Sequence, residues 1–162
     1  MFSYKSLALA AVSFAVAGQA LAAGEQITKE EMIKFVDEAA AFAKKVGKEA
    51  AVKELNDQKG KFWRHNGELY IFGYNMDGVN VVHPQKPALV GKNLMGLKDP
   101  KGTAVVKGLI DSVNNKEGKG EFVWMWENPA SKKVEPKHGY SVKIVDPKGD
   151  WFLGSGVHLP QK

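Results

Sequence analysis

The sequence contains no cysteine among its 162 residues. Disulfides, thiolate metal sites, thiol redox chemistry and covalently attached c-type haem are therefore excluded. Arginine is almost absent as well, because Arg64 stands alone among 23 basic residues. Nucleic-acid-binding surfaces usually present clusters of arginine and lysine on one face, whereas a dispersed lysine-rich surface mainly promotes solubility. We therefore predict no nucleic-acid partner.

Long apolar runs are also scarce, and the one candidate lies at the N-terminus. Residues 7–17 form an apolar stretch behind Lys5, and Ala20-Leu21-Ala22 follows as a small-residue cleavage pattern. The stretch is too short to cross the ~30 Å of a bilayer core, and its layout is that of a secretory signal. We predict a signal peptide over residues 1–22, cleaved near Ala22-Ala23, and one exported, periplasmic or secreted domain over residues 23–162.

Motifs for catalysis and for metal binding are missing too. No pair of histidines has the H-x-x-x-H or H-E-x-x-H spacing, and no glycine-rich phosphate loop is present. Gly154-Ser155-Gly156 lacks the strand-to-helix setting of a nucleophile elbow. We expect no metal, no cofactor and no enzymatic activity; the alternative that stays open is an enzyme with His83 as general base.

The patterns that are present predict an α+β domain. A capping box at Thr28-Lys29-Glu30-Glu31 precedes apolar residues at helical spacing, which predicts a helix continuing to about Leu55. A second helix is predicted over residues 103–113. Strand patterns occupy residues 68–74, 79–83, 122–127, 138–145 and 151–158, separated by turn signals. This order predicts a long N-terminal helix packed on a five-stranded antiparallel sheet.

Aromatic residues gather on the predicted strands. Tyr70, Phe72 and Tyr74 share one face of the first strand, and further rings follow at Trp124, Trp126 and Tyr140. An apolar concavity with a few polar groups is the usual form of a small-ligand site, although such rings can also simply form core. Lys137 stands close by in sequence. It differs from Tyr140 by three positions, so both could face one pocket only if Lys137 lies in the loop before the strand.

Four stretches follow one another along the chain: GELYIFGYNMDGVNVVHPQKPALVGKNLMGLKDPKG, GKGEFVWMWENP, KHGY and DWFLGSGVHL. Together they resemble a single-Cache domain, the extracytoplasmic sensor module of bacterial chemoreceptors and sensor kinases. The resemblance covers about residues 28–159. It implies a PAS-like sheet with a pocket on one face, covered by the loop after the His-Pro motif, for small organic acids such as acetate, propionate or pyruvate.

The resemblance also implies roles for individual residues. His83 would lie at the pocket edge, Trp126 would be a pocket aromatic, and Lys137 and Tyr140 would hold a carboxylate. Trp124 stands where a tyrosine is common in the family, and Asn75 where an aspartate is common. We predict a ligand site formed by Tyr70, Phe72, His83, Trp124, Trp126, Lys137 and Tyr140.

Three functions follow as hypotheses. The leading one is a periplasmic domain that binds a small carboxylate and acts through a membrane sensor kinase, chemoreceptor or transporter. The second is a ligand-free interaction module whose aromatic face is filled by its own side chains. The third is the enzyme using His83, a residue that could equally well just end a strand. A homodimer through the N-terminal helix is a further expectation from the resemblance.

Overall fold

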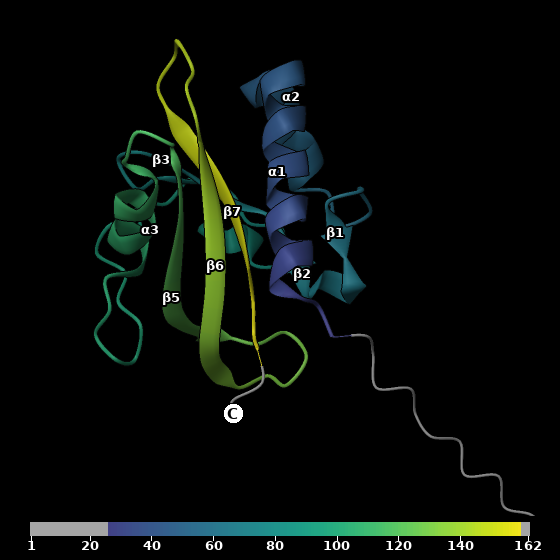
Figure 1. Ribbon diagram of the computed structural model, residues 1–162, viewed down its shortest axis with the longest axis vertical. Coiled ribbons are helices and arrows are strands. Elements are labelled where there is room, and N and C mark those ends of the chain that lie inside the picture. The colour runs from purple at the N-terminus through teal and green to yellow at the C-terminus, as the bar shows by residue number, and fades with distance from the viewer. Residues whose placement is uncertain (1–25, 160–162) are drawn as a thin grey trace, which may run out of the picture.

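A computed structural model describes residues 26–159. The helices α1 (Lys29–Val46) and α2 (Lys48–Leu55) lie on one side of the strands, and α3 (Val105–Val113) lies on the other (Figure 1). The predicted α+β fold with a five-stranded antiparallel sheet is confirmed. The predicted signal peptide lies outside the described residues.

The first helix begins where the capping pattern predicts. The backbone N–H of Glu31 donates to Oγ1 of Thr28 over 3.0 Å, which satisfies one of the free donors of the first turn. The Glu31 carboxylate does not complete the box but lies 2.8 Å from His65 Nε2. Gly47 has a φ of 83° and separates α1 from α2, so the predicted single helix is two helices.

The main sheet brings the early and late parts of the chain together. Its strands are β3 (Phe72–Asn75), β4 (Asn80–Val82), β5 (Lys119–Glu127), β6 (Val134–Ile144) and β7 (Trp151–Val157). Their order is β4-β3-β7-β6-β5, and every neighbouring pair is antiparallel. The last strand therefore lies at the centre of the sheet, between strands from the two halves of the chain.

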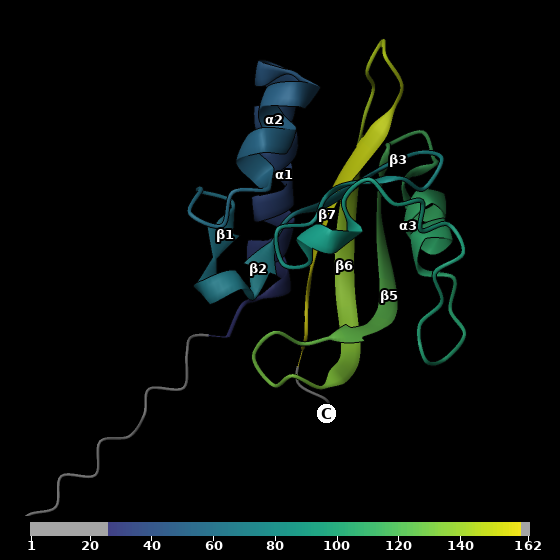
Figure 2. The same cartoon turned by 180° about the vertical axis from the view of Figure 1, so that it is seen from behind.

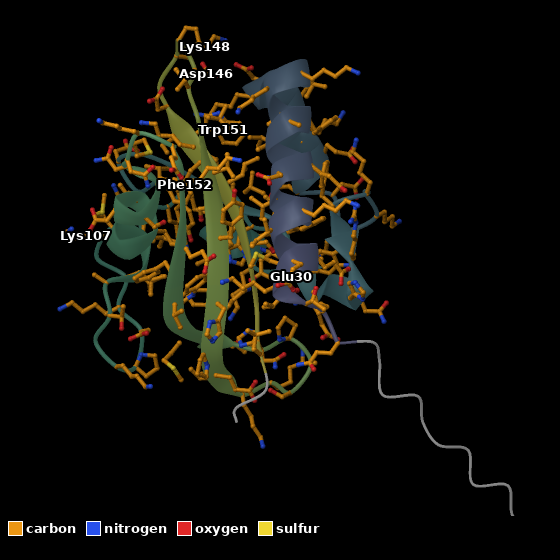
Figure 3. The ribbon with its side chains drawn as sticks, viewed as in Figure 1. Glu30, Lys107, Asp146, Lys148, Trp151 and Phe152 are labelled. Atoms are coloured by element: carbon orange, nitrogen blue, oxygen red, sulfur yellow. The ribbon has the colours of Figure 1, made fainter. Side chains whose placement is uncertain are left out.

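The two faces of the sheet bury separate apolar clusters. Trp151 and Phe152 are neighbours in β7 and point to opposite sides, Trp151 toward α1 and Phe152 toward α3 (Figure 3). Side-chain alternation along each strand produces this division. The α1-side cluster contains Leu69 and Ile71, whereas the α3-side cluster contains Tyr70, Phe72 and Tyr74. The predicted facing of this segment is confirmed.

Several of the predicted strand boundaries are wrong, and β5 begins at Lys119 rather than at residue 122. The strand expected at residues 68–74 is interrupted at Ile71, and its first part, β2 (Leu69–Tyr70), pairs with the short strand β1 (Trp63–Arg64). At Tyr70 the hydroxyl of Ser155 donates to the backbone carbonyl over 2.7 Å, in place of a backbone donor. The strand expected at residues 138–145 begins earlier, because β6 already starts at Val134.

The segment between β4 and α3 contains a 3₁₀ turn, η2 (Pro87–Leu89). A second 3₁₀ turn, η1 (His65–Gly67), joins β1 to β2. In Figure 2 the teal segment that includes η2 passes in front of β6 and β7. This segment covers part of the α3-side face.

Three strand glycines make room for large side chains on the α3-side face. A Cβ on Gly139 would lie 2.4 Å from the Trp124 ring, and one on Gly154 would lie 2.6 Å from the Phe72 ring. A Cβ on Gly156 would lie 2.8 Å from Cε of Lys137. Real Cβ contacts are not this short, so these glycines are required by close approach rather than by turn geometry.

Gly139→Ala is expected to lower the free energy of unfolding by about 1–3 kcal/mol, because the added methyl group overpacks the Trp124 ring. Gly96→Ala is the matched control, since nothing lies within 4 Å of a Cβ at that position, and its effect should stay within about 0.5 kcal/mol. Urea unfolding of both variants measures this. Equal midpoints for the two variants would contradict the role of Gly139.

Candidate ligand-binding site

A small cavity lies on the α3-side face of the sheet, and its walls are mainly aromatic. It is lined by Tyr70, Phe72, Tyr74, His83, Val105, Leu109, Trp124 and Trp126. Five of the seven residues predicted for the site are in this lining. The cavity volume is ≈ 10 Å³, which is about the space of one water molecule. The rings themselves occupy most of the site.

The rings contact one another in a network of edge-to-face, tilted and stacked pairs. Phe72 and Trp124 meet edge to face, with centroids 5.8 Å apart. His83 lies between Tyr70 and Trp126, at 5.3 Å and 6.2 Å from their centroids. Such pairs favour defined orientations, each contributing about 0.5–1.5 kcal/mol beyond burial. A ligand must therefore displace or reorient an ordered set of rings.

Lys137 is the charged group closest to this network. Its side chain is 1% exposed, and its Nζ lies 3.1 Å from the hydroxyl of Tyr70 and 4.3 Å from the centre of the Tyr70 ring. Within residues 26–159 this hydroxyl is its hydrogen-bond partner and no carboxylate pairs with it. Burial, reinforced by the like charge of Lys86, lowers the pKa of Lys137 to about 7.

His83 is held at the edge of the site from both sides. Its backbone N–H donates to Oδ1 of Asn56 over 3.0 Å, and its Nδ1 accepts the backbone N–H of Lys86 over 3.0 Å. The neutral ring therefore carries its proton on Nε2. Burial, and then the charge of Lys137, lower the pKa of His83 to about 3. At neutral pH His83 is an uncharged hydrogen-bond donor and a poor general base.

The segment covering the site is fastened to β5 at two places. Nζ of Lys86 lies 2.6 Å from a carboxylate oxygen of Glu127, and 5.6 Å from the Trp126 ring. Further along, Asp99 accepts the backbone N–H of Met125 over 2.8 Å. Both contacts are made to strand residues that flank Trp126, so the segment is held over the rings.

Asp99 also organises the turn that leads into α3. Its Oδ1 accepts the backbone N–H groups of Lys101 and Thr103, each over 2.9 Å. Burial tends to raise the pKa of Asp99, but the hydrogen bonds from Met125, Thr103 and Lys101 outweigh it and hold the pKa below its ordinary value. The Asp-Pro-Lys-Gly motif thus positions α3, whose residues Val105 and Leu109 form one wall.

Tyr140 does not join the other predicted residues. Because Lys137 lies inside β6, the three-residue separation places the two side chains on opposite faces. Tyr140 belongs to the α1-side cluster, and its hydroxyl lies 3.2 Å from Oδ1 of Asp37 on α1. The expectation that Lys137 and Tyr140 jointly hold a ligand is therefore wrong in its geometry, and Tyr140 instead ties the helix to the sheet.

Three lining residues were missed from the sequence. Tyr74 shares the face of Tyr70 and Phe72, and strand alternation alone could have included it. Burial raises the pKa of its hydroxyl to about 12. Val105 and Leu109 belong to the apolar stripe of α3. Such a stripe predicts that the helix packs against the sheet, but it does not predict which face of the sheet.

Two larger hollows lie at the ends of the sheet. One of ≈ 570 Å³ is lined by His65, Asn128 and His158, and one of ≈ 620 Å³ is lined by Lys48 and Lys148, among others. Some of their charged groups are already paired, as His65 is with Glu31 and Lys148 with Glu49. The aromatic cavity is the better candidate, because the buried Lys137 contacts its Tyr70 and has no carboxylate partner within residues 26–159.

A family model described as "Cache domain" matches residues 20–161. The chain belongs to the Cache domain family. A solved structure, of a methyl-accepting chemotaxis protein from Vibrio parahaemolyticus, is 31% identical, with a TM-score of 0.67 over 80% of this chain and 87% of that one. A second, described as "Structural basis for carboxylic acid recognition by a Cache chemosensory domain", is 27% identical, with a TM-score of 0.64 over 81% and 92%.

Relatives among characterised proteins are of two kinds, a sensor histidine kinase and methyl-accepting chemotaxis proteins. The sensor histidine kinase MctS of Rhizobium johnstonii is 34% identical over 90 residues, which are 56% of this chain and 19% of that protein. The chemotaxis protein McpP of Pseudomonas putida is 25% identical over 96 residues, 59% of this chain and 17% of that protein. The chain thus matches about a fifth of the length of these relatives.

None of the helices within residues 26–159 is long and apolar enough to span a membrane. In the same residues no cluster of three or more histidine, aspartate or glutamate side chains is arranged to hold a metal ion.

Lys137→Met is expected to stabilise the ligand-free protein at pH 7, because it removes a buried amine without a counter-ion. The folded-state pKa of about 7 lies below the ordinary 10.5, so between these values the unfolded chain binds more protons than the folded one. Wild-type stability therefore rises with pH above about 7, by at most ~1.4 kcal/mol per pH unit, and the advantage of the variant shrinks.

Urea unfolding of the wild type and of Lys137→Met at pH 6, 7, 8 and 9 measures the difference between their free energies of unfolding. Groups that titrate equally in both proteins do not contribute to this difference. Lys107→Met is the control, since Lys107 projects away from the sheet on α3 (Figure 3). A wild-type-minus-variant difference that stays constant from pH 6 to 9 would contradict the lowered pKa of Lys137.

Proposed function

We propose that this Cache domain binds a small organic acid at the aromatic site, and that its occupancy regulates a membrane-bound sensor kinase, chemoreceptor or transporter. The observation that supports the proposal is the buried amine of Lys137, which lacks a carboxylate partner throughout residues 26–159. Protein folding alone gives no reason to keep such a group.

The physical argument concerns the cost of burying this amine. A buried cation without a counter-ion is strongly unfavourable, and the group responds by losing its proton. A carboxylate arriving at Nζ would supply the missing charge through charge-assisted hydrogen bonds, each contributing about 1.5–3 kcal/mol. The proton on Nε2 of His83 and the hydroxyl of Tyr70 are further groups that could orient the same anion.

The size and lining of the site restrict the ligand. A cavity of ≈ 10 Å³ admits a ligand only if rings move, so a compact acid is favoured over an extended one. The walls offer apolar surface for a short tail. A single lysine provides for one carboxylate, and the lining contains no carboxylate to pair with a ligand ammonium group. These features favour small monocarboxylates over dicarboxylates and amino acids.

The relatives agree with this proposal at the level of family. One solved Cache domain is described in terms of carboxylic acid recognition, and the curated relatives are a sensor kinase and a chemotaxis protein. A membrane partner of that kind is the simplest way in which ligand binding could be reported.

A second function is favoured by the small cavity itself. If the rings fill the site permanently, the domain would be a ligand-free interaction module. The enzyme hypothesis has less support, because Nδ1 of His83 is occupied by the N–H of Lys86 and its pKa is lowered to about 3.

Acetate, propionate and pyruvate are expected to raise the melting temperature, while succinate and alanine should have little effect. A ligand at 100 times its dissociation constant contributes ~2.7 kcal/mol, which corresponds to a shift of about 5–10 °C in a domain of this size. Lys137→Met should abolish the shift and Tyr70→Phe should reduce it, because both change contacts at Nζ.

Tyr140→Phe is the matched control for Tyr70→Phe. It removes a hydroxyl from the opposite face, next to Asp37, so it should lower stability by about 0.5–1.5 kcal/mol and leave the ligand-induced shift unchanged. A screen in which no acid changes the melting temperature would overturn carboxylate binding and favour the interaction module.

A further inference from the structure

The charged and titratable groups around Lys137 come from every element packed against it. Tyr70 on β2 contacts its Nζ, and His83 follows β4. Lys86 and Glu127 form the ion pair above Trp126.

His158 follows β7, and its Nδ1 donates to the carbonyl of Pro136 over 3.1 Å. On β6 itself, Glu135 shares the face of Lys137 but lies toward the end of the sheet, where Asn128 and Ser131 donate to it.

Most of these neighbours have a fixed charge near neutral pH. Burial, followed by the charge of Lys137, lowers the pKa of both nearby histidines, to about 3 for His83 and about 4 for His158. Both rings are therefore neutral. Burial raises the pKa of Tyr70 far above neutrality. Lys137 is left as the group at this site whose protonation changes around pH 7.

The position of Lys137 gives a physical reason why its protonation state would change when an anion binds beside it. Its stem packs against the α-carbon of Gly156, its Nζ reaches a tyrosine hydroxyl, and water is excluded. The amine is stable in this position without a counter-ion, but the ammonium is not. An anion beside Nζ reverses that preference.

We propose that the organic acid and a proton bind together at this site, with Lys137 taking up the proton as the carboxylate arrives. The inference rests on the proposed function, because it requires an acid at the aromatic site. The bound state is a carboxylate paired with an ammonium, and the balance is one ligand anion plus one proton from solvent. The domain would then report the acid more strongly when its surroundings are mildly acidic.

The expected pH dependence follows from linkage. Above the titration midpoint of Lys137, the pH at which half of its amines are protonated, each anion binds together with about one proton. The apparent affinity for the acid therefore falls about tenfold per pH unit. Below it Lys137 is already an ammonium, proton uptake approaches zero and the affinity levels off. The affinity falls again only where the acid itself becomes protonated, at a pH of about 4–5.

Isothermal titration calorimetry with acetate and with propionate tests this, using pairs of buffers that differ in ionisation enthalpy. The uptake expected for a midpoint of about 7 is about 0.1 proton at pH 6, 0.5 at pH 7 and nearly 1 at pH 8.5. The dissociation constant should rise about sixteenfold between pH 7, where half of the amine is already unprotonated, and pH 8.5, where the unprotonated amine predominates.

Two surface variants should move this midpoint in opposite directions. Lys86→Met removes the like charge that acts on Lys137 and should shift the midpoint to higher pH. Glu127→Gln removes the partner of Lys86 and should shift it to lower pH. Lys107→Met, on the outward side of α3 (Figure 3), removes an equal charge away from the site and should not shift it.

The possible outcomes separate the two proposals. If neither acid binds, the proposed function fails, and this inference fails with it. If an acid binds without proton uptake from pH 6 to 8.5, the function stands and the inference is overturned. If Lys86→Met and Lys107→Met shift the midpoint of proton uptake equally, the proton is taken up by a group other than Lys137. This result would also overturn the inference.

Discussion

A lysine buried without a counter-ion is the physical constraint around which the candidate site is arranged. Lys137 occupies the interior only because the surrounding backbone leaves space for its stem and because Tyr70 offers a hydroxyl to its end. The rings that shield it from water also lower its pKa to about 7. The group that costs stability in the empty protein is the one that would recognise an anion.

Much of the remaining structure serves to hold rings around this lysine. The strand glycines at 139, 154 and 156 admit Trp124, Phe72 and the stem of Lys137 close to the backbone. The Lys86–Glu127 pair and the contact from Asp99 to Met125 hold the covering segment on β5. The exposed ion pair by itself contributes little stability, whereas the buried backbone contact made by Asp99 is the firmer attachment.

The sheet connects the candidate site to the long helix. Neighbouring residues of one strand contact opposite layers, as Trp151 and Phe152 do (Figure 3). On β6 the same relation holds for Lys137 and Tyr140, the second of which contacts Asp37 on α1. A movement of strands at the site therefore has direct contacts through which to reach α1, as a sensor domain requires.

Local patterns in the sequence determined the helices, the aromatic face and the family. Thr28 caps α1 because its hydroxyl lies within a few residues of the free backbone N–H groups, and alternation alone separates Tyr70 and Phe72 from Leu69 and Ile71. Only the tertiary structure decided that β6 begins at Val134 and that Tyr140 faces α1, because the start of a strand depends on its pairing with β5. It also decided that Lys137 has no carboxylate beside it, since the presence of a counter-ion depends on residues far apart in sequence.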